Sequence, residues 1–535
     1  MKRMKRLASF VLAMVMIMTM TMSAFAAKVD NKTGHSYDAY QIFSGTQADG
    51  DAALGDVEWG SGIKGDEFLT ALKADLRFVK SEVNVFASCT TAMQVADVLA
   101  KNTDLADAFA NVADANLTTT KIEIAKDATD VTLDPGYYLL VDTEDVSGAY
   151  AASNSALLQV TGQEDILMKD KYDLPVPDKD IIRILNADSE GQAYLTGSEV
   201  GDAEIGNTIT FSLTGTVSKN LADYETYYYA FHDTMSAGLK YVEGSAKVYI
   251  AGSPDTEITG FTVDQTVNEK GNLHFVCNNL KAVEGVTASS MIKVVYEATL
   301  EKNAVIGSAG NPNTMYIEYS NNPNHDSEGS TGNTEKDTVV IFTYELDVNK
   351  IDDATNNKLQ GAQFVLLNSD ATKVAKVVDG VLDGWVAVPT PDEAGNIAWP
   401  AESVLTSGAD GKFSIKGLDS GDYFLKEIKA PAGYNLLTEN IKLTIQVSLV
   451  PPQGPDEEDS AEPSVEYLAL VVNAGDPVEK DATVGIVDTT VANNKGGVLP
   501  ETGGMGTTIF YVIGAVLVIG AGVLLVTRRR MNTEA

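Results

Sequence analysis

The chain has few of the residues that usually cross-link exported proteins or bind metals. Its 535 residues include only 2 cysteines, Cys89 and Cys277, and 4 histidines. The cysteines fall in different predicted domains, so we expect buried apolar thiols rather than a disulfide. The histidines have no metal-ligand spacing, and the motifs of serine hydrolases, zinc proteases and phosphate-binding loops are absent. The sequence therefore predicts no metal, no cofactor and no multiple-turnover enzyme.

Basic residues are also scarce. The chain has 75 acidic against 39 basic residues, which gives a formal net charge of −36. A surface this acidic argues against nucleic acid or anionic lipid as a partner, because both carry the same sign of charge. It favours a soluble protein outside the cell.

The amino terminus carries an export signal. A basic start, Lys2–Arg6, precedes an apolar stretch at Leu7–Met22 and the small-x-small site Ala24–Ala26. This pattern predicts a signal peptide over residues 1–26, with the mature chain beginning at Ala27.

The carboxyl terminus carries a second signal, Leu499-Pro500-Glu501-Thr502-Gly503, followed by an uncharged apolar run and three arginines. The run, Ile509–Val526, holds 18 residues, and we predict a transmembrane helix there. The combination resembles the cell-wall sorting signal of Gram-positive surface proteins. The resemblance implies cleavage by a sortase between Thr502 and Gly503, attachment to peptidoglycan, and a location at the cell wall.

Between these signals, short alternating runs are broken by Gly, Asn, Asp and Pro, which is typical of antiparallel β-sandwiches. Apolar residues at three- and four-residue spacing predict one helical region near 65–110. Boundaries are expected near Pro175 and after the polar stretch 321–336. We predict an all-β protein of tandem immunoglobulin-like sandwiches at 27–170, 171–342 and 343–498, with a small helical segment in the first and the sorting signal at 499–535.

The last predicted domain places three polar side chains on apolar faces. Strand alternation puts Glu427 with Tyr423 and Leu425, Lys350 with Leu346 and Val348, and Asn493 with Val491. Burial lowers the pKa of a lysine and raises that of a carboxyl, so a neutral amine would face a protonated acid. The protonated acid could donate a hydrogen bond to the Asn side-chain carbonyl and polarise it. The amine could then attack the amide, release ammonia and leave an isopeptide bond. A structural ion pair between Lys350 and Glu427 is the alternative.

A longer motif surrounds Glu427. The run Tyr423-x-Leu425-x-Glu427-x-x-Ala430-Pro431-x-Gly433-Tyr434 resembles the E-box of CnaB-type domains in Gram-positive pilins and adhesins. The resemblance implies an isopeptide bond between Lys350 and Asn493, with Glu427 as the single-turnover catalytic acid. Asn494 stays open as the alternative amide.

The middle domain has a similar pattern with Asp in place of Glu. Tyr229, Phe231 and Asp233 share one strand face, and Met315, Ile317, Tyr319 and Asn321 share another. Together with Pro177–Asp180 these segments resemble the CnaA-like middle domain of major pilins. The resemblance implies a bond between Lys179 and Asn321 with Asp233 as the acid, and Asn322 as the alternative amide.

The first domain shows a weak internal repeat with the last, so we expect a CnaB-like fold there too. Lys28 and Asp142 fit the repeat, but no Asn partner is evident. At the junction to the middle domain, the resemblance to backbone pilins implies that Lys169 is the lysine that accepts the neighbouring subunit, although Leu167-Met168 stands where those pilins usually have Tyr-Pro. Lys171 is its competitor.

The resemblance covers the whole chain and implies a major backbone pilin of a Gram-positive bacterium. Subunits would be polymerised covalently from Thr502 to a lysine of the next subunit. The implied partners are a sortase, identical subunits and peptidoglycan, with minor or tip pilins and a host surface as further candidates. The rival function is a monomeric wall-anchored adhesin or tip pilin that binds a host matrix protein or glycan.

Overall fold

The computed structural model describes residues 26–47, 54–153, 155–161, 165–168, 174–185, 192–323, 330–451, 463–495 and 506–531. The predicted signal peptide lies outside these residues except for residue 26. The sorting motif Leu499-Pro500-Glu501-Thr502-Gly503 and the two candidate acceptor lysines, Lys169 and Lys171, also lie outside them.

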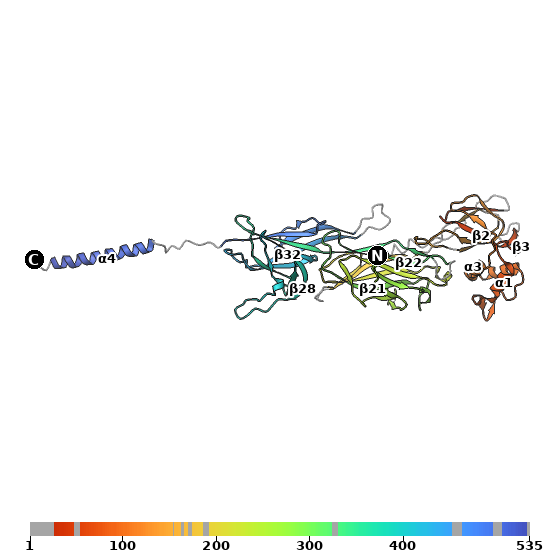
Figure 1. Cartoon of the computed structure of the whole chain (residues 1–535), viewed down its shortest axis with the longest axis horizontal. Coiled ribbons are helices and arrows are strands. Elements are labelled where there is room, and N and C mark those ends of the chain that lie inside the picture. Colours follow the sequence, from red (N-terminus) through yellow and green to blue (C-terminus); the bar gives the residue numbers. More distant parts are fainter. Residues whose placement is uncertain are drawn as a thin grey trace.

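Three β-rich bodies follow one another along the long axis of the molecule, and a helix stands at the carboxyl end (Figure 1). The predicted all-β fold class is confirmed by this architecture. The predicted boundaries near 170 and 343 fall between strands β10 and β11 and between β24 and β25, whose bounds are given below.

The first body packs a five-stranded sheet between three helices on one face and a three-stranded sheet on the other. Alternation along β2 and β8 makes this possible: Ile42 and Leu139 face the helices, whereas Ala39 and Tyr138 face the small sheet. The strands are β1 (Ala27–Asn31), β2 (Tyr37–Gln47), β3 (Leu54–Trp59), β6 (Ile122–Ile124), β7 (Val131–Leu133), β8 (Gly136–Asp142), β9 (Ser155–Val160) and β10 (Ile166–Met168), with a hairpin of β4 (Val79–Lys80) and β5 (Val83–Asn84).

The helical region predicted near 65–110 consists of three helices. They are α1 (Gly65–Ala74), α2 (Ala92–Lys101) and α3 (Ala106–Asp114). Helix α2 begins after Thr91, whose hydroxyl accepts a hydrogen bond from the Gln94 amide at 3.3 Å. Phe68, Val95 and Phe109 are fully buried where the three helices meet the sheet.

The middle body is a sandwich of two seven-stranded sheets around one apolar core. The first sheet contains β11 (Pro177–Leu185), β12 (Gln192–Ser198), β14 (Thr208–Thr216), β16 (Leu239–Tyr241), β17 (Lys247–Ile250), β18 (Thr256–Glu257) and β21 (Met291–Leu300). The second contains β13 (Val200–Asp202), β15 (Tyr229–Met235), β19 (Thr262–Asp264), β20 (Leu273–Cys277), β22 (Asn311–Ser320), β23 (Thr331–Asn333) and β24 (Asp337–Phe342).

The last body is one eleven-stranded sheet in which the first and last strands are parallel neighbours. Its strands are β25 (Tyr344–Asp352), β26 (Gln363–Leu367), β27 (Lys373–Val378), β28 (Val381–Ala387), β29 (Leu405–Thr406), β30 (Lys412–Leu418), β31 (Gly421–Lys429), β32 (Ile441–Val450), β33 (Ser464–Val472), β34 (Val478–Glu479) and β35 (Ile486–Asn493). The pairing of β25 with β35 brings residues from opposite ends of the domain side by side.

Helix α4 (Gly506–Met531) includes the apolar run near the carboxyl end, with side chains described from 510 to 526. Within the part of the chain that the structure describes, no helix is both long and apolar enough to cross a membrane. The prediction of a transmembrane helix at 509–526 is therefore contradicted.

Candidate functional site

The last body brings together the three side chains that the sequence predicted. Lys350 lies on β25, Asn493 on β35 and Glu427 on β31. The parallel register pairs Lys350 with Val491 and Asp352 with Asn493. Lys350, Asn493 and Glu427 are only 0%, 1% and 3% exposed, so each polar group depends on the others for hydrogen bonds. Asn494, the alternative amide, is exposed.

The three groups form a directed chain of contacts. Lys350 Nζ donates hydrogen bonds to Asn493 Oδ1 and, at 3.0 Å, to the Val491 carbonyl. Asn493 Nδ2 donates to Glu427 Oε1 and Oε2 at 3.0 and 2.9 Å. Lys350 Nζ lies 4.0 Å from Glu427 Oε1. The amine therefore contacts the amide oxygen, and the acid contacts the amide nitrogen.

The segment after β31 closes over this cluster. The Leu437 amide donates to Glu427 Oε2 at 2.9 Å, and the Asn435 carbonyl accepts from Asn493 Nδ2 at 2.8 Å. Tyr434 Oη donates to Asp352 Oδ2 at 2.6 Å. Sequence reasoning found Tyr434 as part of the motif but missed Asn435 and Leu437, because both act through backbone atoms.

Burial sets the charge state of the amine. Removal of Lys350 from water lowers its pKa to about 8, although the nearby Glu427 carboxylate opposes the shift. A substantial neutral fraction is therefore present near neutral pH, and only the neutral amine has a lone pair that can attack a carbonyl carbon.

The middle body holds a second buried lysine, which contacts an acid of the opposite sheet. Lys179 on β11 donates from Nζ to Asp233 Oδ2 on β15, and both residues are fully buried. Lys179 Nζ also lies 5.4 Å and 5.7 Å from the ring centroids of Phe211 and Tyr296. Burial lowers the pKa of Lys179 and raises that of Asp233, so the apolar core favours a neutral amine beside a neutral carboxylic acid.

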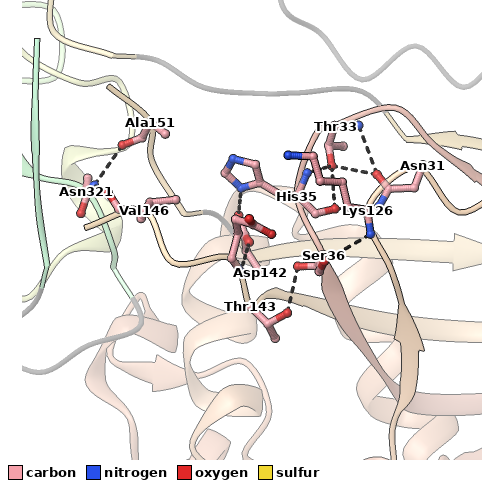
Figure 2. A network of polar contacts seen from close by, with 11 residues as sticks. Asn31, Thr33, His35, Ser36, Lys126, Asp142, Thr143, Val146, Ala151 and Asn321 are labelled. Carbon is pink, nitrogen blue, oxygen red and sulfur yellow. Dashed lines mark hydrogen bonds and ion pairs between the residues drawn. The ribbon is translucent and has the colours of Figure 1, made fainter. Parts of the chain in front are cut away.

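The structure does not bring Asn321 to this pair, which corrects the predicted set. Asn321 follows the end of β22, and its Nδ2 donates to the carbonyls of Val146 and Ala151 at 2.6 and 3.1 Å (Figure 2). Ser330 Oγ donates to Asn321 Oδ1 at 2.7 Å. Asn321 thus binds the segment between β8 and β9 of the first body, and the alternative Asn322 also lies beyond the end of β22.

Asn313 occupies the position that the sequence analysis gave to Asn321. It lies on the same inward face of β22, and the β15–β22 register pairs Met235 with Asn313 and Asp233 with Met315. Alternation along β22 points to both asparagines, and the register distinguishes them: Asn313 lies two positions from the residue paired with Asp233, whereas Asn321 follows the end of the strand.

A phenol connects Asn313 to the Lys–Asp pair. Asn313 Nδ2 donates to Tyr296 Oη at 2.6 Å, and Tyr296 Oη donates to Asp233 Oδ2 at 3.0 Å. Lys179 Nζ lies 3.5 Å from the same Oη. Among the described residues, Asp233 Oδ1 and Asn313 Oδ1 are buried and have no hydrogen-bond partner. The sequence analysis did not identify Tyr296 because no motif marks it.

The first body does not repeat this arrangement at its candidate residues. Lys28 is exposed, whereas Asp142 is buried and lies 2.7 Å from His35 Nδ1 (Figure 2). The buried Asn31 has its hydrogen bonds satisfied elsewhere: its Nδ2 donates to the His35 and Ala125 carbonyls at 2.7 and 3.0 Å, and its Oδ1 accepts from Thr33 Oγ1 at 2.8 Å. Lys28 and Asp142 therefore do not form a buried pair.

A separate buried network in the middle body centres on Glu318. His232 Nε2 and Lys270 Nζ contact Glu318 Oε2 at 2.8 and 2.6 Å, and Thr331 Oγ1 donates to Oε1 at 2.7 Å. Burial alone would raise the pKa of Glu318, but these hydrogen bonds lower it to about 2. The network stabilises the fold and lies outside the Lys179 cluster.

Three family models match the chain. Residues 344–451 match a prealbumin-like fold domain (SpaA), residues 205–323 match the Cna-B-like domain of Gram-positive pilin backbone subunit 2, and residues 492–533 match the LPXTG cell wall anchor motif. The chain thus contains one domain that matches a Gram-positive pilin backbone domain, together with an LPXTG cell wall anchor motif. The resemblance inferred from the sequence is thereby confirmed, as is a location at the cell wall. The middle match is described as Cna-B-like, whereas the sequence analysis implied a CnaA-like domain.

Individual proteins are similar over long stretches. The trypsin-resistant surface T6 protein of Streptococcus pyogenes serotype M6 is 25% identical over 386 residues, which cover 61% of this chain and 65% of that protein. The solved T6 backbone pilin has 17% identity and a TM-score of 0.49, over 89% of this chain and 100% of that one. The major pilin SpaD of Corynebacterium diphtheriae has 16% identity and a TM-score of 0.45, over 89% and 99%.

Proposed function

We propose that the chain is the shaft subunit of a sortase-assembled pilus, stabilised within each subunit by Lys–Asn isopeptide bonds. The observation that carries the proposal is the presence, in one chain, of an LPXTG anchor motif and two buried Lys–acid–Asn clusters. The match of residues 205–323 to a pilin backbone domain supports the same function. Each acid acts only once, during maturation, so the chain is not a multiple-turnover enzyme. Its LPXTG motif makes it a substrate of sortase.

In the last domain the bond joins Lys350 to Asn493. The lone pair of the neutral Nζ attacks Cγ of Asn493, and a C–N bond forms. Glu427 contacts the departing Nδ2 and gives it a proton, while the attacking nitrogen returns a proton to the carboxylate. The Cγ–Nδ2 bond breaks, ammonia leaves, and Glu427 is regenerated. The acid thus acts on the leaving nitrogen, whereas the sequence analysis expected it to polarise the carbonyl of the Asn493 side chain.

In the middle domain the corresponding bond joins Lys179 to Asn313, with Asp233 as the acid. The support is the shared contact of Lys179 and Asn313 with Tyr296 Oη, and the burial of all four side chains. This bond would connect the two sheets of the sandwich, because β11 and β22 belong to different sheets.

The positions of these bonds suit a shaft under tension. β25 and β35 are the first and last strands of the last domain and run parallel as neighbours. A force applied to the two ends of the domain would otherwise shear the hydrogen bonds between them. A covalent bond from Lys350 to Asn493 carries that load instead.

Assembly would use the two ends of neighbouring subunits. Sortase cleaves after Thr502 and transfers its carbonyl to a lysine amine of the next subunit, for which Lys169 remains the prediction and Lys171 the alternative. Such a contact joins two different surfaces and does not close on itself, so repetition gives a filament. Transfer to peptidoglycan would anchor the filament, and minor or tip pilins and a host surface are further proposed partners.

Coexpression with the cognate sortase tests the polymer. The wild-type chain should give a ladder of high-mass species that resists SDS and reductant, and Lys169→Ala should give only monomer. Lys101→Ala, at an exposed lysine of α2, is the matched control and should leave the ladder intact. If only Lys171→Ala loses the ladder, the acceptor is Lys171 and not Lys169. A wild-type chain that is anchored to the wall but never polymerises would favour the monomeric adhesin.

A further inference from the structure

The two proposed cross-link sites differ in how the acid reaches the amide. In the last domain, Glu427 contacts Asn493 Nδ2 directly at 2.9 and 3.0 Å. In the middle domain the acid is Asp233, whose side chain is one methylene shorter. There Asn313 Nδ2 instead contacts Tyr296 Oη at 2.6 Å, and Tyr296 Oη contacts Asp233 Oδ2 at 3.0 Å.

We propose that Tyr296 is a catalytic residue of the middle domain, where its phenol relays a proton from Asp233 to the leaving nitrogen of Asn313. The inference rests on the proposed function, since it takes the bond between Lys179 and Asn313 as the reaction. It goes further by assigning a fourth reacting group and by giving the two domains different proton paths.

The surroundings of Tyr296 suit a fixed relay. It lies on β21, is fully buried, and packs against the rings of Phe211, Phe275 and Tyr241 with centroid separations of 5.4, 5.5 and 6.0 Å. These contacts hold Oη between the acid and the amide. Burial raises the pKa of the phenol well above its usual value, so Tyr296 keeps its proton until Asp233 can replace it.

The step balances without any added reactant. Neutral Lys179 Nζ attacks Cγ of Asn313 and forms a C–N bond. The attack gives Nδ2 a lone pair, so the phenol hydrogen, which points to Asp233 before the reaction, turns towards Nδ2. Asp233 then gives its carboxyl proton to Tyr296 Oη as Oη gives its own proton to Nδ2, so the phenol ends unchanged. The Cγ–Nδ2 bond then breaks and ammonia leaves. The proton lost from Nζ returns to Asp233 Oδ2, which Nζ already contacts.

The last domain supplies an internal comparison. Its nearby phenols are committed elsewhere: Tyr434 Oη donates to Asp352 Oδ2 and Tyr423 Oη donates to Asp419 Oδ1, both at 2.6 Å. No contact in the described residues joins either phenol to Lys350, Glu427 or Asn493. A glutamate that reaches the amide does not need a relay, whereas the shorter Asp233 does.

The test follows the cross-linked peptide containing Lys179 and Asn313 over time. The mature chain, residues 27–502, is made by cell-free synthesis, sampled at intervals, digested and measured by mass spectrometry. Tyr296→Phe, which removes only the hydroxyl, should form this peptide about 100-fold or more slowly than wild type. Tyr241→Phe removes a phenol from the same aromatic cluster and should keep the wild-type rate. The Lys350–Asn493 peptide should form normally in both variants.

Formation of the Lys179–Asn313 peptide at the wild-type rate in a folded Tyr296→Phe chain would overturn the relay and leave the proposed cross-link standing. If the wild type does not form the Lys179–Asn313 peptide, both the proposed cross-link and the relay are wrong. Should Tyr296→Phe not fold, site-specific 3-fluorotyrosine at this position keeps the ring and hydroxyl but makes the phenol more acidic. A relay then predicts a changed rate of bond formation, and an unchanged rate overturns it.

Discussion

Glu427→Gln tests the cross-link of the last domain with a minimal change in shape. The substitution keeps the length of the side chain and removes the group that can give a proton to Asn493 Nδ2. Lys350 and Asn493 should therefore stay unjoined. The mature chain should then be heavier than wild type by one ammonia molecule, apart from the small mass difference of the substitution.

The loss of stability can be worked out from the positions of the two residues. Lys350 and Asn493 are 143 residues apart in sequence. The loop-entropy relation used for disulfides gives about 5 kcal/mol for a cross-link that closes a loop of this length. For a domain of roughly 150 residues, this corresponds to a thermal midpoint about 10–20 °C lower. Loss of one ordinary hydrogen bond, at about 1 kcal/mol, would give a much smaller shift.

Intact mass and differential scanning calorimetry on residues 27–502 measure both effects. Asn494→Ala is the matched control, because Asn494 is adjacent in sequence but exposed. It should keep both the wild-type mass deficit and the thermal midpoint. The reasoning would be refuted by Glu427→Gln protein that still shows the full deficit. It would equally be refuted by an uncross-linked last domain that melts at the wild-type temperature.

Three further predictions follow from the remaining contacts. Asn313→Ala should cost the middle domain its cross-link, so that one ammonia fewer is lost, whereas Asn321→Ala should keep the full mass deficit; the opposite pattern would restore the original prediction. Since the pKa of Lys350 is lowered to about 8, freshly synthesised chain moved into buffers of different pH should form the Lys350–Asn493 bond about tenfold more slowly for each pH unit below 7, and a flat profile would contradict a neutral amine nucleophile. The pKa of Glu318 is about 2 in the folded protein, against 4.5 for the free side chain. Its ionised form therefore adds about 3 kcal/mol to the free energy of unfolding above pH 4.5, and this stabilisation is lost as the pH falls towards 2. Calorimetry between pH 6 and 2 should show the middle domain losing stability more steeply than in Glu318→Gln, and equal slopes would exclude this contribution.

Strand alternation was sufficient to predict the site of the last domain. Lys350, Glu427 and Asn493 each lie within a clear run of alternating apolar residues, so the face of each side chain could be deduced without knowing the pairing. The E-box motif then selected these three from the other buried polar residues. The predicted contact of the acid with the amide carbonyl was wrong: Glu427 contacts the amide nitrogen, a detail that depends on side-chain conformation.

The middle domain shows where alternation stops being informative. Asn313 and Asn321 both fit the inward face of β22, and the choice between them depends on the register of β22 against β15. A shift of the register by an even number of residues keeps the same side chains facing inward, so alternation within one strand does not decide between these two positions. Tyr296 was missed for a related reason, since a buried tyrosine in a β-sandwich usually serves packing, and only the three-dimensional contacts distinguish a reactive one.

The helical region of the first domain was predicted by its periodicity but not divided correctly. Three- and four-residue spacing runs through α1, α2 and α3, and the hairpin of β4 and β5 interrupts it with only two residues in each strand. Such short strands have no alternation long enough to detect.

Tandem mass spectrometry of polymer isolated from the cell surface tests the central claim most directly. The account predicts a peptide in which the Thr502 carbonyl is joined to the Lys169 amine of another subunit, together with the internal cross-links Lys179–Asn313 and Lys350–Asn493. Surface protein in which Thr502 is joined only to peptidoglycan, and never to a lysine of this chain, would contradict the assignment as a shaft subunit.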